Sequence, residues 1–219
     1  MDALDRLAGA AADLLARVDD TLAHAGAPDD HPIWPLLRLV RALPGDAVAA
    51  IAALELAPLG SAATVLRRTI GGYAAVRDTL PDELGWAGAG AESFAAQWAA
   101  LGAHLGTTPD EGITGRLTAT LSYVDATEAW IRAGRAAVAR TLAEVLTCLE
   151  AVRVRTGGEG AAHSAADIGA RLLACVAGVC ERGERVLDEW RGPLAELPYV
   201  PPAAIRTPAG GEGTTIVPT

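Results

Sequence analysis

The feature that most constrains the fold of this 219-residue chain is an apolar stripe between Leu117 and Val152. Alternating steps of three and four residues define eleven positions, nine of which are apolar. The spacing predicts one helix with one buried face, which at ~1.5 Å per residue would be about 50 Å long. Since such a face must be covered, we expect other helices to pack along it.

The two polar positions in this stripe are Glu128 and Arg135, seven residues apart. A charge at a core position destabilises a fold unless it is paired, so these residues could specify helix register or contact a partner. Alternatively, the stripe rotates along the helix and both side chains extend from its edge into solvent. The second interpretation is the favoured one.

Composition agrees with an all-α fold. Hydrophobic residues make up 51% of the chain and aromatic residues only 4%, and much of the hydrophobic fraction is alanine, a strong helix former. The length is enough to bury roughly 70% of the surface that the unfolded chain exposes. All 18 basic residues are arginine, and lysine and asparagine are absent, which indicates a GC-rich genome of the kind found in actinobacteria.

Charge and cysteine content argue against several partners and locations. A net charge of -9 without a basic run argues against nucleic acid as a partner. The three cysteines, Cys148, Cys175 and Cys180, do not suggest disulfides, so we expect folding in the cytoplasm. No cleavable signal peptide is expected at the N-terminus. Glu55, Pro58 and Gly60 interrupt the most apolar long window, residues 47–66, so membrane binding is not expected.

Periodicity and helix-breaking residues divide the chain into segments. Pro44 and Pro58 are expected to end two short helices, and Ser61 to cap the N-terminus of the next one, which would end before Pro81. The expected helices cover residues 4–22, 35–43, 46–56, 61–80, 90–105, 117–152 and 165–190. The expected organisation is N-terminal accessory helices (1–58), a long helical hairpin (59–155), a C-terminal helix packing on the bundle (164–191) and a Pro/Gly-rich tail (192–219).

Residues 85–98, GWAGAGAESFAAQW, concentrate aromatic residues in an aromatic-poor chain. Trp86 and Gly88 are expected in a turn, because glycine permits backbone angles and close approaches that other residues do not. A new helix would begin near Gly90. Phe94 and Trp98 then share one face of that helix with Leu101 and Leu105. Without further context, these would be core residues at a helix–helix turn.

The Trp86-Ala87-Gly88 turn, with Phe94 and Trp98 following it, resembles the WXG (ESAT-like) family of helical-hairpin proteins handled by type VII (ESX) secretion systems. The resemblance covers about residues 60–152. It implies two antiparallel helices joined at the Trp-x-Gly turn and a non-enzymatic function in binding another protein, as a secretion substrate or the partner of one. Hetero- or homodimers are typical of such a family.

Two features depart from the family pattern. Members with their own export signal carry Tyr-x-x-x-Asp/Glu, whereas Tyr73, Tyr123 and Tyr199 are followed four residues on by arginine, threonine and alanine. The hairpin is also longer than in the family and has additional helices at both ends. Export by a signal-peptide-independent system is therefore one expectation, and a cytosolic chaperone-like or regulatory scaffold is the alternative.

No catalytic or cofactor-binding pattern is evident. His24, His31, His104 and His163 show no ligand spacing with one another or with the cysteines, so no metal site is expected. The glycine-rich segments lack the preceding strand and the lysine of a phosphate-binding loop. We therefore expect neither an enzyme nor a cofactor.

Overall fold

The computed structural model describes residues 2–79, 87–106 and 111–195. Within these ranges all regular structure is α-helical, which confirms the predicted all-α bundle. The helices are α1 (Ala3–Ala25), α2 (Ile33–Val40), α3 (Pro44–Ala52), α4 (Ala57–Asp78), α5 (Ala89–Leu105), α6 (Gly112–Thr147), α7 (Leu149–Thr156) and α8 (Ala161–Ala195).

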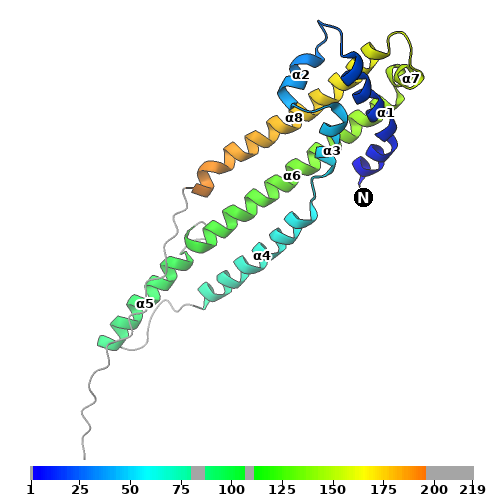
Figure 1. The fold of residues 1–219 in the computed structure, drawn as a ribbon. Coiled ribbons are helices and arrows are strands. Elements are labelled where there is room, and N and C mark those ends of the chain that lie inside the picture. Colours follow the sequence, from blue (N-terminus) through cyan, green and yellow to red (C-terminus); the bar gives the residue numbers. More distant parts are fainter. Residues whose placement is uncertain (1, 80–86, 107–110, 196–219) are drawn as a thin grey trace, which may run out of the picture.

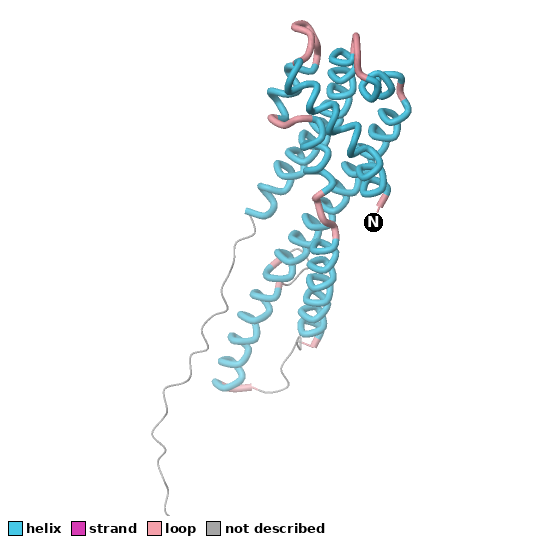
Figure 2. The backbone as a smooth tube through the Cα atoms, turned by 45° about the vertical axis from the view of Figure 1, so that its right-hand side comes forward, coloured by secondary structure: helices cyan, strands magenta, loops and turns pink. Residues whose placement is uncertain are grey.

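The helices form two regions, which we call the head and the stalk (Figure 1). The head comprises residues 2–52 and 131–179, and the stalk comprises the described residues of 57–130 together with 180–195. In the stalk, α6 lies between α8 and α4, and contacts both. The smaller helices α1, α2, α3 and α7 gather at one end around α6 and α8 (Figure 2).

All residues of the main hydrophobic core lie in the head, between residues 4 and 51 or between 138 and 179. The N-terminal helices, expected to be accessory, supply much of it: α1 buries Leu4, Leu14 and Val18, the stripe expected over residues 4–22. Asp2 caps α1, accepting a hydrogen bond from the Asp5 amide while the Asp5 carboxylate accepts one from the Asp2 amide. Local capping and long-range packing thus both stabilise α1 as a helix.

Two prolines expected to end helices instead begin them. Pro44 and Pro58 occupy the first turns of α3 and α4, where the missing amide hydrogen costs nothing because no carbonyl precedes it in the helix. Ser61 therefore lies inside α4 and is not its N-cap. The Gly45 amide at the start of α3 donates to both carboxylate oxygens of Asp19 at 3.1 Å, and burial raises the pKa of that carboxyl.

The expected continuous helix over residues 117–152 is wrong at its C-terminal end. Cys148 has an extended backbone, and α6 gives way there to α7. The break shifts the buried face by two residues, so Ala151 and Val154 are buried while Leu149 and Val152 are 60% and 52% exposed. The break thereby directs Ala151 and Val154 towards the head core.

Glycines bring α6 and α8 close together where the head meets the stalk. A Cβ at Gly134 would lie 2.8 Å from Val179, and one at Gly183 would lie 2.7 Å from the ring of Trp130. The Trp130 indole donates a hydrogen bond of 2.9 Å to the carbonyl of Val179. Packing of the two long helices is therefore tight at this boundary.

Candidate functional site

Arg135 is a buried arginine that joins three segments distant in sequence. Its side chain on α6 forms ion pairs with Asp2 at 2.7 Å and Asp5 at 2.6 Å, both at the start of α1. Its Nη1 donates to the carbonyl oxygens of Ala52, the last residue of α3, and of Leu54, just beyond it. Since Arg135 is only 6% exposed, the expectation that it extends into solvent is wrong.

These contacts connect the start of α1 and the end of α3 to α6. The hydrogen bond from its guanidinium is the main reason why the pKa of Asp2 falls from 3.8 to about 2. The pKa of Asp5 is lowered first by the Asp2 amide and next by Arg135. A buried charge is tolerated when it is paired and hydrogen-bonded, and it then disfavours other arrangements of the same helices. Arg135 thus fixes α1 and the α3–α4 connection on α6.

Glu128, the other polar residue in the stripe, lies on the stalk part of α6. It pairs with Arg132 one turn further along the same helix, and its side chain is 22% exposed. Such an i,i+4 pair contributes only about 0.3–0.5 kcal/mol. Among the described residues, Glu128 therefore has no contact comparable with those of Arg135.

The structure describes only part of the predicted hairpin motif. Trp86 lies outside the described residues. Gly88 precedes α5 with φ +108°, a conformation that favours glycine, and α5 begins at Ala89, close to the expected Gly90. Among the described residues nothing lies within 4 Å of a Cβ placed at Gly88, and its positive φ is a conformation that favours glycine.

Phe94 and Trp98 stack on α5 with ring centroids 5.3 Å apart. Phe94 is nevertheless 41% exposed. The Trp98 Nε1 atom is buried, and within the described part of the chain it has no hydrogen-bond partner, an arrangement that typically costs about 1–3 kcal/mol. The Phe94 ring thus remains partly exposed to solvent.

The long antiparallel pair of the stalk is formed by α4 and α6, while α5 lies at the end of the stalk away from the head (Figure 1). Arg67 on α4 bonds to Asp125 on α6 at 2.7 Å, and both side chains are about half exposed. Helix α4 buries a single side chain, Ala63. It leaves Val65 and Val76 50% and 47% exposed.

Two helical stretches, residues 44–78 and 161–195, are long and apolar enough to cross a membrane by length and composition alone. Residues 44–78 consist of α3 and α4 with a break between them, and 17% of their most apolar window is buried. In residues 161–195, half of the most apolar window is buried, as in a core helix of a soluble protein. Taken alone, this is weak evidence for membrane insertion.

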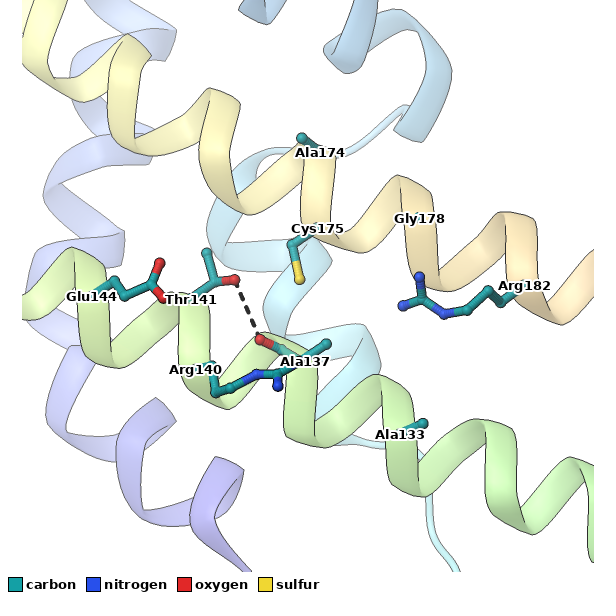
Figure 3. Close-up of a pocket in the computed structure, with 9 residues that line it drawn as sticks. All are labelled: Ala133, Ala137, Arg140, Thr141, Glu144, Ala174, Cys175, Gly178 and Arg182. Atoms are coloured by element: carbon teal, nitrogen blue, oxygen red, sulfur yellow. Dashed lines mark hydrogen bonds between the residues drawn. The ribbon is translucent and has the colours of Figure 1, made fainter.

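One groove runs between α6 and α8 and has a volume of about 710 Å³ (Figure 3). Small residues line much of it, among them Ala137, Ala174 and Gly178, and Arg140 and Arg182 enter it from the two helices. A second groove of about 630 Å³ lies between α2 and α8. Both are furrows between neighbouring helices.

One cluster was missed from sequence: the structure brings His31, His163 and Asp167 together, with one ligand atom of each within 4.8 Å of the others. The spacing of four residues between His163 and Asp167 places both on one helix face and was a usable signal. His31 joins them through the tertiary fold, 132 residues away from His163. Comparison of the chain with family models, curated proteins and solved structures gives no match.

Proposed function

We propose that this protein acts by binding another protein through its stalk and does not catalyse a reaction. The carrying observation is the exposed apolar surface of the stalk, where α4 buries only Ala63 and leaves Val65 and Val76 about half exposed. Exposed apolar residues that recur along one region are typical of interaction surfaces. The head, in contrast, contains the whole main hydrophobic core, although Leu39, Leu149 and Val152 remain exposed on its surface.

The partner that we propose is helical, and the binding serves type VII secretion, with this chain as a substrate or as the partner of one. The resemblance of Trp86-Ala87-Gly88 and Phe94 to the WXG motif supports this assignment. The positive φ of Gly88, the start of α5 directly after it and the stacked aromatic pair are compatible with a helix-forming turn motif. The Phe94 ring is 41% exposed and adds an apolar group to the surface of α5.

The alternative is a cytosolic chaperone-like or regulatory scaffold that binds through the same surface. The missing Tyr-x-x-x-Asp/Glu signal favours it. The two functions differ in location, so the test is to follow the full chain in a strain that secretes other type VII substrates. Appearance in the medium that depends on the secretion system supports the first function. Retention in the lysate supports the second.

The binding surface is tested by co-expressing the chain with its neighbouring gene products and measuring complex mass by size-exclusion chromatography with light scattering. The double variant Val65→Glu, Val76→Glu is expected to lose the complex. Leu39→Glu, at a 69% exposed apolar position on the head, is the matched control and should retain it. A monomer without partners, or equal binding by both variants, would contradict the proposal. Vesicle flotation of the wild type, lost in the stalk variant, would instead indicate a membrane as the target.

A further inference from the structure

A cluster of two imidazoles and one carboxylate lies in the head, away from the stalk surface. The His31 Nε2 atom is 3.2 Å from Asp167 Oδ1, and the His163 Nε2 atom is 3.6 Å from Asp167 Oδ2. The two imidazole rings are nearly perpendicular, with centroids 5.5 Å apart. His31 follows α1, whereas His163 and Asp167 lie one turn apart at the start of α8.

The three side chains are close enough for small side-chain movements to bring their ligand atoms around one metal ion. Zinc binds nitrogen and oxygen ligands at about 2.0–2.1 Å, which places neighbouring ligand atoms about 3.4 Å apart. In the structure each imidazole lies near a different carboxylate oxygen, at 3.2 Å from Oδ1 and 3.6 Å from Oδ2, and one ligand atom of each residue lies within 4.8 Å of the others. Two imidazoles and a carboxylate form a ligand set that suits zinc and other first-row transition metals, whereas Mg²⁺ and Ca²⁺ prefer oxygen ligands alone.

The surroundings fit a site that is fixed on one side and open on the other. The His31 side chain is 5% exposed, so its ring is held by the fold. The His163 side chain is 62% exposed and Asp167 is 34% exposed, which gives an ion access from solvent and leaves room for a water ligand. A bound ion would connect the α1–α2 loop to α8.

We propose that His31, His163 and Asp167 form a binding site for one divalent transition-metal ion of the zinc class. The three side chains supply the protein ligands, and solvent supplies the remaining position. This inference does not depend on the proposed interaction function, because none of the three residues belongs to the stalk.

Metal binding requires a change of tautomer at His31. The Ile33 amide donates to His31 Nδ1 at 3.2 Å, so the ring proton of the metal-free side chain lies on Nε2 and points to Asp167. When Nε2 binds the ion, the proton moves to Nδ1 and the Ile33 amide loses its acceptor. The signal of the Ile33 amide in a ¹H–¹⁵N spectrum is therefore expected to shift when the site is filled.

The test uses the full chain stripped of metal and titrated with Zn²⁺ by calorimetry and with Co²⁺ by visible absorption. His163→Ala removes an exposed ligand and is expected to lower the affinity at least ~100-fold, more than the loss of an outer-shell partner does. Asp167→Asn, which keeps the shape of the side chain, should also weaken binding. His104→Ala, on α5, is the control and should bind like the wild type. Mg²⁺ should not compete.

The Co²⁺ spectrum and the comparison of variants distinguish metal binding at the cysteines from metal binding at the proposed site. Thiolate ligation of Co²⁺ adds a sulfur-to-metal charge-transfer band, which the proposed site would lack. Saturable binding that is lost in His163→Ala and shifts the Ile33 amide supports the proposal. Equal affinity of the wild type and His163→Ala, no saturable binding by the wild type, or equal competition by Mg²⁺ overturns it. Circular dichroism confirms that each variant is folded.

Discussion

The head and the stalk are built from similar alanine-rich helices, but they differ in how much of their surface is covered. In the head, Leu142 of α6 is fully buried among residues from both ends of the chain. In the stalk, the same helix α6 is flanked by α4 and the end of α8, and apolar residues such as Val65 and Leu187 are half exposed. Helix propensity is thus sufficient to explain why both regions are helical. Only the head has the packing that makes a stable core.

The largest expected difference concerns core truncation. Leu142→Ala in the head should destabilise the protein by about 4 kcal/mol, because it removes apolar contacts and leaves a cavity. Val65→Ala in the stalk should change stability by less than about 0.5 kcal/mol, because the side chain is half exposed. Urea unfolding followed by circular dichroism measures both. A comparable loss in the two variants would show that the stalk is packed as well as the head.

The next difference concerns ion pairs. Arg135→Ala in the head should cost about 3 kcal/mol, because it leaves carbonyl groups of the α3–α4 connection and the carboxylates of α1 without their donor. Arg67→Ala breaks the exposed pair with Asp125 in the stalk and should cost under about 1 kcal/mol. Equilibrium unfolding in urea provides both values. If Arg135→Ala were as mild as Arg67→Ala, the proposed register function would have to be abandoned.

The effect of a glycine-to-alanine exchange on stability should have opposite signs in the two regions. At Gly169 in α8, an added Cβ would lie 2.7 Å from Ile33 and 3.0 Å from Pro44, so alanine should destabilise the head by about 2 kcal/mol. At Gly71 in α4 no other described residue, apart from the adjoining helix backbone, comes within 4 Å of that position, so alanine should stabilise the helix by about 0.5–1 kcal/mol. Thermal unfolding of both variants shows the two signs. The same sign in both would contradict the comparison.

The smallest expected effect is the pH dependence that Arg135 gives to the head. The pKa of Asp2 is lowered from 3.8 to about 2 in the folded chain, so its contribution is present above about pH 4 and is lost as the pH falls towards 2. A shift of this size corresponds to about 2.5 kcal/mol for a buried group, and the 44% exposure of Asp2 reduces it to about 1 kcal/mol. Urea unfolding at pH 5 and pH 2.5 measures the loss. The corresponding decrease should be smaller in Arg135→Ala.

Features with local signals were predictable from the sequence. The stripe of α1, the start of α5 after Gly88 and the interruption between α5 and α6 follow from residues close to one another in the chain. The first turns of α3 and α4 were misassigned because a proline either ends a helix or begins one, and local sequence does not decide which. At Cys148 neither glycine nor proline marks the break.

The features set by tertiary contacts were not predictable. Arg135 was singled out as a charge in an apolar stripe, but its partners Asp2 and Asp5 lie 133 and 130 residues away. His31 likewise reaches Asp167 across 136 residues. A periodic pattern indicates which face of a helix is buried, and it contains no information about which distant residues will lie against it.

The origin of the head from two separated parts of the chain also has a consequence for biosynthesis. Its core joins residues 4–51 to residues 138–179. At about 5–20 residues per second, a ribosome takes roughly 6–25 s to advance from residue 51 to residue 179. During that time the apolar side of α1 has been made and the surface of α8 that will cover it has not. The core of the head therefore closes only after residue 179 has been synthesised.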